Sequence, residues 1–297
     1  MNASPTQPAL EWQVAGACNY DCSYCIQSPR YRRGRPSADD LRAAIRCFAR
    51  LPGTWEIKCS GGEAFAHPLF LDLAVPALMA DTPHHISILS NLSAGEADLD
   101  RFLAMTRGRL RVVSASLHVE HVDPSAFADK VARMRDRADP DVRFVVNQVV
   151  LPGQVAAAAA CRAIVESRGL RWFPQLFKHK ILKQMRVAAY PDADALAALL
   201  GDRPGPQDAN LSPSYRGRMC WAGAAYFVVD KDGQAWRCRS SKREDRVSIG
   251  SVFDDTLRLS DGPRPCAYSL CPCTVPANRG MISGVPAAGL SAVEEDA

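Results

Sequence analysis

Strand-like and helix-like runs alternate along the chain up to residue 176, and this alternation restricts the fold more than any other feature. The strand-like runs cover residues 11–16, 55–60, 85–90, 111–117, 142–151 and 170–176. Helical segments separate them, which is the pattern of β-α-β units and of a parallel sheet. Six such units, where a closed barrel needs eight, predict an α/β fold with an open, partial (βα)6 TIM-like barrel.

The helices between these strands carry their own sequence signals. Ser37 is a predicted N-cap for a helix whose apolar residues fall at the spacing of one buried side, namely Leu41, Ala44, Ile45 and Phe48, together with Cys47. Pro68 suits the first turn of a second helix that runs to about Met79. Further covering helices are predicted at residues 96–106, 125–138 and 154–167.

Three cysteines lie within eight positions directly after the first predicted strand. Cys18, Cys22 and Cys25 are in the loop where α/β barrels place their chemistry. A fully chelated iron–sulfur cluster or a structural zinc takes four ligands, so a metal group held by this loop keeps one position open. The other interpretations are half of a zinc site, completed by a distant residue, or thiols buried in the core.

The Cys-x3-Cys-x2-Cys spacing resembles the loop of the radical SAM superfamily, which binds a [4Fe-4S] cluster and leaves its fourth iron for S-adenosylmethionine (SAM). Tyr24 matches the aromatic residue that this family places near the adenine ring. Gly61, Gly62 and Glu63 follow the second predicted strand, and they resemble the family segment that holds the methionine amino group. The resemblance covers roughly residues 11–185 and implies the same partial barrel.

Other SAM contacts are carried over from the family by their place in strand order. Ser90 and Asn91 lie at the end of the third strand, Ser116 lies in the fourth and Asn147 in the fifth. All four are predicted to contact the carboxylate or the ribose of SAM. Gln175 and Lys178 at the sixth strand are weaker candidates. Each of these is equally consistent with a hydrogen-bonded polar group at a strand end.

A second group of five cysteines lies near the end of the chain. Cys220 and Cys238 flank a predicted β-hairpin with its turn at residues 230–233, and three more follow: Cys266, Cys271 and Cys273. Residues 215–273 resemble the SPASM or twitch domain of radical SAM enzymes, and five thiols imply one auxiliary [4Fe-4S] cluster. Cys220, Cys238 and Cys271 are the expected ligands, with Cys273 preferred over Cys266 as the fourth. A structural zinc ribbon is the alternative.

The chain divides into five predicted segments. A flexible N-terminus covers residues 1–10, the radical SAM core 11–190, a Pro-rich linker 191–214, the twitch or SPASM-like domain 215–275 and a C-terminal tail 276–297. The linker contains a short Ala/Leu-rich helix.

Composition excludes several classes of protein. Hydrophobic residues make up 47% of the chain, charged residues 23%, and no run is long enough to span a bilayer. The first nine residues lack the features of a secretory signal, so we expect a cytoplasmic protein whose 11 cysteines are reduced. The net charge of +4 is spread along the chain and does not indicate nucleic-acid binding.

One basic cluster follows the cysteine loop and consists of Arg30, Arg32, Arg33 and Arg35. It is either a solvated face or a contact surface for an anionic substrate or an electron donor. A flavodoxin or ferredoxin, the donor that the resemblance implies, is typically acidic.

His118, Glu120 and His121 form a further polar group. The sequence indicates no third metal ligand beside the two histidines, so we interpret them as structural or substrate-facing.

The resemblance implies reductive cleavage of SAM to a 5′-deoxyadenosyl radical, and an auxiliary cluster favours oxidation of the substrate by dehydrogenation or crosslinking. Cys18 leaves no room for a preceding peptide-recognition domain, which favours a small biosynthetic molecule. A ribosomally made peptide is one alternative. A redox-neutral epimerase with a cysteine hydrogen donor is another, and a non-catalytic iron–sulfur or zinc-binding regulator is a third.

Overall fold

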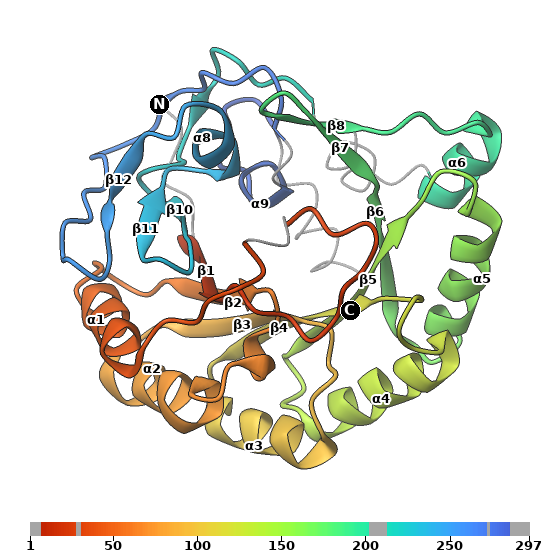
Figure 1. Cartoon of the computed structure of the whole chain (residues 1–297), viewed down its shortest axis with the longest axis horizontal. Helices are drawn as coiled ribbons and strands as arrows, with labels where there is room; N and C mark the ends of the chain where they lie inside the picture. Colours follow the sequence, from red (N-terminus) through yellow and green to blue (C-terminus); the bar gives the residue numbers. More distant parts are fainter. Residues whose placement is uncertain (1–6, 28–30, 202–212, 272–273, 286–297) are drawn as a thin grey trace.

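A central sheet in the order β12-β11-β10-β1-β2-β3-β4-β5-β6 organises the computed structural model, which describes residues 7–27, 31–201, 213–271 and 274–285 (Figure 1). Its first six strands in chain order are β1 (Ala9–Ala15), β2 (Glu56–Gly61), β3 (His85–Ser90), β4 (Leu110–Leu117), β5 (Arg143–Val150) and β6 (Arg171–Leu176). All five pairings among them are parallel. The sheet curves without closing, so the predicted open α/β barrel is confirmed.

Helices cover the outer face of the curved sheet, as the outer arc of Figure 1 shows. They are α1 (Ala38–Ala49), α2 (Val75–Asp81), α3 (Glu96–Thr106), α4 (Pro124–Arg137) and α5 (Val155–Glu166), followed by α6 (Ala193–Leu200) in the predicted linker. Ser37 caps α1 as predicted, in a reciprocal capping box with Asp40. None of the helices in the described ranges combines the length and the apolar character needed to cross a bilayer.

Residues alternate between the two faces of β1, and this alternation creates the cavity described below. Leu10, Trp12 and Val14 belong to the hydrophobic core between the sheet and the helices. Glu11 and Gln13 point to the opposite, inner face and line a cavity. The alternation of apolar and polar residues in β1 therefore places polar groups on the inside of the half-barrel.

The predicted helix from Pro68 to Met79 begins at Phe70, with a first turn wider than that of an α-helix. Residues Phe70–Ala74 form a wide turn in which the Ala74 N–H bonds to the Leu69 carbonyl, and α2 begins only at Val75. Pro76 lies in the first turn of α2. Because proline has no N–H to donate, the preceding hydrogen-bond ladder is not continued through it.

The C-terminal part of the chain extends the same sheet. β10 (Tyr226–Val229) pairs in parallel with β1, β11 (Gln234–Trp236) pairs antiparallel with β10, and β12 (Ser248–Ser251) pairs antiparallel with β11. β10 and β11 are the hairpin predicted between Cys220 and Cys238. Two short strands, β9 (Met219–Cys220) and β13 (Arg264–Pro265), pair beside this extension.

Two further segments lie across the opening between β6 and the C-terminal strands (Figure 1). A hairpin of β7 (Lys178–Ile181) and β8 (Gln184–Val187) follows β6, and helices α8 (Arg239–Glu244) and α9 (Thr274–Asn278) come from the C-terminal part. Gln184 of β8 donates a hydrogen bond of 3.3 Å to Glu244 of α8. The opening of the half-barrel is thereby narrowed by residues far apart in the sequence.

Buried ion pairs join the C-terminal segment to the first strands. Glu11, only 4% exposed, accepts hydrogen bonds from Tyr226 of β10, at 2.7 Å, and from Arg239 of α8. Burial alone raises the pKa of Glu11, but Arg239, followed by Lys58 and the Tyr226 hydroxyl, outweighs burial and lowers that pKa to about 2. The ion pair with Arg239 therefore keeps Glu11 charged inside the sheet.

Replacing Arg239 with Met is expected to lower the free energy of unfolding by about 3 kcal/mol, because Glu11 loses its buried ion-pair partner. The contribution of Glu11 is present above its ordinary pKa of 4.5 and is lost as the pH falls through about 2, so denaturant unfolding at pH 7 measures it in full. The control R258M removes an exposed arginine that bonds only a neighbouring carbonyl. Equal stability of both variants would contradict a structural role for the pair.

Candidate active site

A cavity of about 440 Å³ occupies the inside of the half-barrel, a size typical of small-ligand and cofactor pockets. All the cofactor-binding residues predicted from the sequence line it: Cys18, Cys22, Tyr24, Cys25, Gly61, Gly62, Glu63, Ser90, Asn91, Ser116 and Asn147, with the weaker candidates Gln175 and Lys178. These residues come from the first loop and from strands β2 to β7 or the positions that follow them. Because the sheet is curved, their side chains face one common cavity.

The cysteine loop supplies a donor set suited to a soft metal group. Cys22 is buried, Cys18 is half-buried and Cys25 is exposed, and the Cys25 N–H bonds to the Cys22 carbonyl at 3.1 Å. Burial raises the pKa of both Cys18 and Cys22, the latter to about 11, so each thiol is protonated at neutral pH when no metal is bound. Iron or zinc supplies the positive charge that reverses this effect, because a coordinating thiol is deprotonated.

Gly61 and Gly62 hold the end of β2 directly against the start of the cysteine loop. The Gly62 N–H donates to the Ala15 carbonyl at 2.8 Å, and the Glu63 N–H donates to the Ala17 carbonyl at 2.9 Å. A Cβ atom on Gly62 would lie 2.2 Å from the Ala17 oxygen, and Gly61 has a φ of +144° that other residues rarely adopt. The two glycines are therefore required by this backbone contact.

Glu63 is a fixed, buried carboxylate next to the loop. Its side chain is 1% exposed and accepts hydrogen bonds from the Ser90 hydroxyl and the Asn91 N–H, both at 2.7 Å. Burial raises the pKa of Glu63, and these hydrogen bonds oppose that effect. The Asn91 amide also donates to Asn19 of the loop at 3.1 Å. Ser90 and Asn91 thus position Glu63, a contact that strand order alone does not predict.

The segment after β4 braces the cysteine loop. His118 Nδ1 lies 2.9 Å from the Tyr24 hydroxyl and 3.5 Å from the Cys22 sulfur. Burial lowers the pKa of His118 to about 4, so its imidazole is neutral at pH 7. A neutral imidazole nitrogen is able to accept a hydrogen bond from the Tyr24 hydroxyl. Glu120 accepts a hydrogen bond of 2.8 Å from the Ser23 N–H. His118 also lines the cavity.

Side-chain atoms of Cys22, Glu120 and His121 lie within 4.8 Å of one another, so the histidine pair has a nearby third donor in space. The sequence does not indicate this donor because Cys22 is about 100 positions away. The thiol of Cys22 is shared with the cysteine loop, and one thiolate completing a loop-bound cluster is not free for a second site.

Comparison with known proteins agrees with this geometry. Residues 12–145 match the family model described as the Radical SAM superfamily. A comparison with curated proteins found no match.

Solved structures share the fold of this chain. The structure of anSMEcpe with bound AdoMet has a TM-score of 0.61 and 14% identity, over 84% of this chain and 78% of that chain. SuiB of Streptococcus suis, bound to its precursor peptide SuiA, has a TM-score of 0.56 and 12% identity, over 84% of this chain and 63% of its own. At these identities the likeness establishes the fold, an incomplete α/β barrel.

The second cysteine group assembles beside the extended sheet. Cys220, Cys238, Cys266 and Cys271 line one small cavity, and Cys273 lies outside the described residues. An apolar cluster packs against these cysteines and includes Tyr226. Met281 and Ile282, from the segment predicted as a C-terminal tail, belong to the same cluster. Four thiols from separate segments therefore meet in one place, a donor set that fits an iron–sulfur cluster or zinc.

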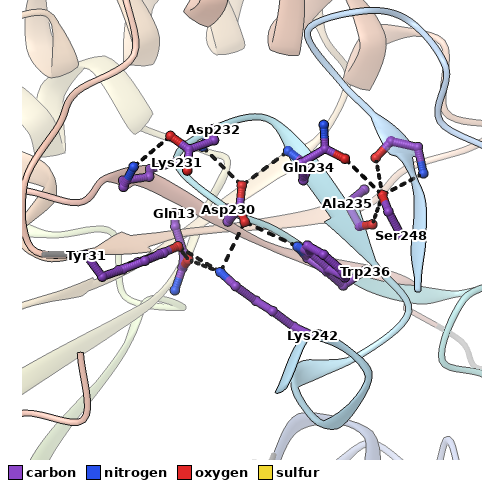
Figure 2. A network of polar contacts seen from close by, with 11 residues as sticks. Gln13, Tyr31, Asp230, Lys231, Asp232, Gln234, Ala235, Trp236, Lys242 and Ser248 are labelled. Carbon is purple, nitrogen blue, oxygen red and sulfur yellow. Dashed lines mark hydrogen bonds and ion pairs between the residues drawn. The ribbon is translucent and has the colours of Figure 1, made fainter. Parts of the chain in front are cut away.

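A polar network connects this region with the flank of the cysteine loop (Figure 2). Lys242 of α8, four residues after Cys238, donates to the Tyr31 hydroxyl at 2.7 Å and to Gln13 at 3.0 Å, and it lies 3.4 Å from Asp230. Burial lowers the pKa of Lys242 to about 8. The network fixes α8 against β1 and against the segment that leaves the cysteine loop.

The remaining predicted residues lie away from the cavity. Cys47, Cys59 and Cys161 belong to the core between the sheet and the helices. Of the basic cluster, Arg33 and Arg35 are exposed and Arg32 is half-buried, whereas Arg30 lies outside the described residues.

Replacing Gly62 with Ala is expected to weaken SAM binding about tenfold or more, since a displacement of about 1 Å at a binding site has effects of that order. The added Cβ would force the Ala17 carbonyl away from the start of the cysteine loop. Anaerobic titration of the reconstituted protein with SAM measures the change. G262A is the matched control, because nothing lies within 4 Å of a Cβ there. Normal SAM affinity in G62A would show that the backbone contact is dispensable.

Proposed function

We propose that this chain is a radical SAM enzyme that oxidatively modifies a small biosynthetic molecule. A radical SAM domain implies a [4Fe-4S] cluster and bound SAM. The observation that carries the proposal is one cavity lined by the three-cysteine loop, by Glu63 and by a polar strand interior. The cluster, when bound, supplies the electron that cleaves SAM to methionine and a 5′-deoxyadenosyl radical.

The residues of the cavity have separate roles in this proposal. Cys18, Cys22 and Cys25 would hold the cluster, and the position that three ligands leave open would take SAM. Glu63 binds the methionine ammonium group, since a buried carboxylate needs a positive partner. Ser116 and Asn147 face the same cavity from β4 and β5 and contact the rest of SAM. Tyr24, held by His118, lies beside the adenine.

We further propose an auxiliary [4Fe-4S] cluster in a twitch-type domain over residues 215–275. Cys220, Cys238 and Cys271 are its ligands, with Cys266 or Cys273 as the fourth. Cys220, Cys238 and Cys271 line one cavity together with Cys266, which supports this assignment. Cys266 is therefore as good a candidate for the fourth ligand as Cys273. These thiols would hold a cluster without an open position, which would supply an acceptor for the electron of the substrate radical, so the reaction would be an oxidation.

The position of the spare thiols favours oxidation over epimerisation. A redox-neutral epimerase needs a hydrogen donor that reaches the substrate. Among the described residues, the only cysteines that line the large cavity are those of the first loop. Cys47, Cys59 and Cys161 lie in the core on the other face of the sheet, where buried thiols are inert.

A peptide is the second candidate substrate. The similar structures include SuiB with the precursor peptide SuiA and anSMEcpe with the Cp18Cys peptide. The size of the cavity and the residues of α8 and α9 in its lining support a small molecule instead. A flavodoxin or ferredoxin of the cytoplasm is the proposed electron donor, and the exposed Arg33 and Arg35 offer it a basic surface.

Two clusters per chain predict a specific loss of iron. The triple variant C18A/C22A/C25A is expected to hold about half the iron of the anaerobically reconstituted wild type, because its second cysteine group is intact. Iron and sulfide analysis measures this. The variant C47A, which changes a core thiol, serves as the control. Retention of all the iron by the triple variant would refute the assignment of the first loop. Zinc instead of iron in the wild-type protein would favour a non-catalytic regulator.

Reductive cleavage of SAM is expected even without substrate. With dithionite and SAM, the wild type should form 5′-deoxyadenosine slowly, and E63Q should form it about tenfold more slowly at low SAM concentration, because the ammonium group loses its charged partner. Chromatography of the nucleoside products measures the rate. E166Q, which changes an exposed glutamate on α5, should resemble the wild type. The absence of 5′-deoxyadenosine from all samples would favour the non-catalytic alternative.

A further inference from the structure

The end of the cavity farthest from the cysteine loop is lined by charged side chains. This charged end consists of Glu11 from β1, Glu56 and Lys58 from β2, Arg239 from α8 and Arg279 just after α9. Glu11 and Lys58 are register neighbours on the paired strands. Since the inner face of a barrel sheet is commonly filled by apolar side chains, five charges here need a reason beyond packing.

Each of the two carboxylates already has an arginine partner. Glu11 pairs with Arg239, and Glu56 pairs with Arg279 at 2.7 Å. Burial raises the pKa of Glu56, but Arg279 outweighs burial and lowers it. Both carboxylates are therefore charged and compensated at neutral pH.

Lys58 is the cation in excess. Three cations face two carboxylates at the charged end, so it keeps one surplus positive charge. Within the described part of the chain, the Lys58 side chain makes no hydrogen bond and no ion pair within 4 Å, although its charge acts on both Glu11 and Glu56. Arg279 adds unused donors, because its Nε and Nη1 are buried and no described residue accepts from them. Buried N–H groups without acceptors are costly, and a ligand that supplies the acceptor would also meet the charge of the half-buried Lys58.

We propose that the charged end binds an anionic group of the substrate, a carboxylate or a phosphate, on Lys58 with support from Arg279. This inference deepens the proposed function and rests on it. Carboxylate and phosphate share the chemistry required here, namely oxygen atoms that accept charge-assisted hydrogen bonds from an ammonium and a guanidinium group.

The distance along β2 sets the size and orientation of that substrate. Lys58 lies three residues before Gly61, which is roughly 10 Å along a strand at about 3.3 Å per residue. Glu63 and the cysteine loop lie at the other end of the same cavity. A substrate anchored at Lys58 therefore presents its other end toward SAM, and its length is that of a small molecule.

Arg239 and Arg279 come from the C-terminal segment, so this anion site is complete only when that segment is folded onto β1 and β2. The segment that carries the second cysteine group thus also builds the substrate end of the first cavity. Removal of the Lys58 charge leaves both ion pairs of the charged end in place. The variant K58M is for this reason expected to fold.

The test uses the reconstituted protein with SAM and three probes that share one carbon frame: glycerol 3-phosphate, glycerate and glycerol. Anaerobic calorimetry should detect binding of at least one anionic probe and no binding of glycerol. In K58M the affinity for that probe should fall about tenfold or more, and K58R should restore most of it, because a charged donor is regained. The control K180M changes an exposed lysine of β7 outside the cavity and should match the wild type.

The two anionic probes distinguish a phosphate from a carboxylate site, and binding of either one supports the inference. Equal binding of all three probes, binding of none, or wild-type anion affinity in K58M would overturn it. If K58M does not fold, the comparison of the three probes on the wild type still decides. Formation of 5′-deoxyadenosine without substrate tests the proposed function separately. Its absence alongside normal anion binding would refute only the radical SAM activity.

Discussion

The contact between the end of β2 and the start of the cysteine loop is the constraint on which the site depends. Gly61 and Gly62 place their backbone where a Cβ atom would collide with carbonyls of Ala15 and Ala17. Two hydrogen bonds across this contact fix the loop and Glu63 relative to each other. The donor set for the metal group and the carboxylate beside it are thereby joined through backbone, which is stiffer than any side-chain contact.

The inside of the half-barrel is polar, and the C-terminal segment stabilises it. Charged residues on the inner face of β1 and β2 require partners, and Arg239 and Arg279 supply them from α8 and from the residue after α9. The same segment carries the second cysteine group and extends the sheet from β1. The cavity, the substrate end proposed for it and the second cysteine group thus depend on a single packing arrangement. A buried ion pair broken on one side would disturb all three.

Several features were predictable because they are local. The alternation of strands and helices, the capping of α1 by Ser37 and the hairpin before Cys238 follow from periodicity, caps and turns, and the structure confirms them. The wide turn before α2 was not predicted, although Pro76 follows it in the sequence. The brace of His118 on Tyr24 and the role of Ser90 in holding Glu63 were also missed, since each joins residues from different strands.

The sequence by itself determined which chemistry is available. The spacing of Cys18, Cys22 and Cys25, followed by Gly61 to Glu63, indicates a metal loop and a carboxylate at the ends of neighbouring parallel strands. Only the tertiary structure decided what those groups face. The meeting of Cys266 with Cys220, Cys238 and Cys271, and the surplus charge of Lys58, arise when distant segments pack on β1. Sequence spacing does not encode such contacts, because they depend on the register and curvature of the whole sheet.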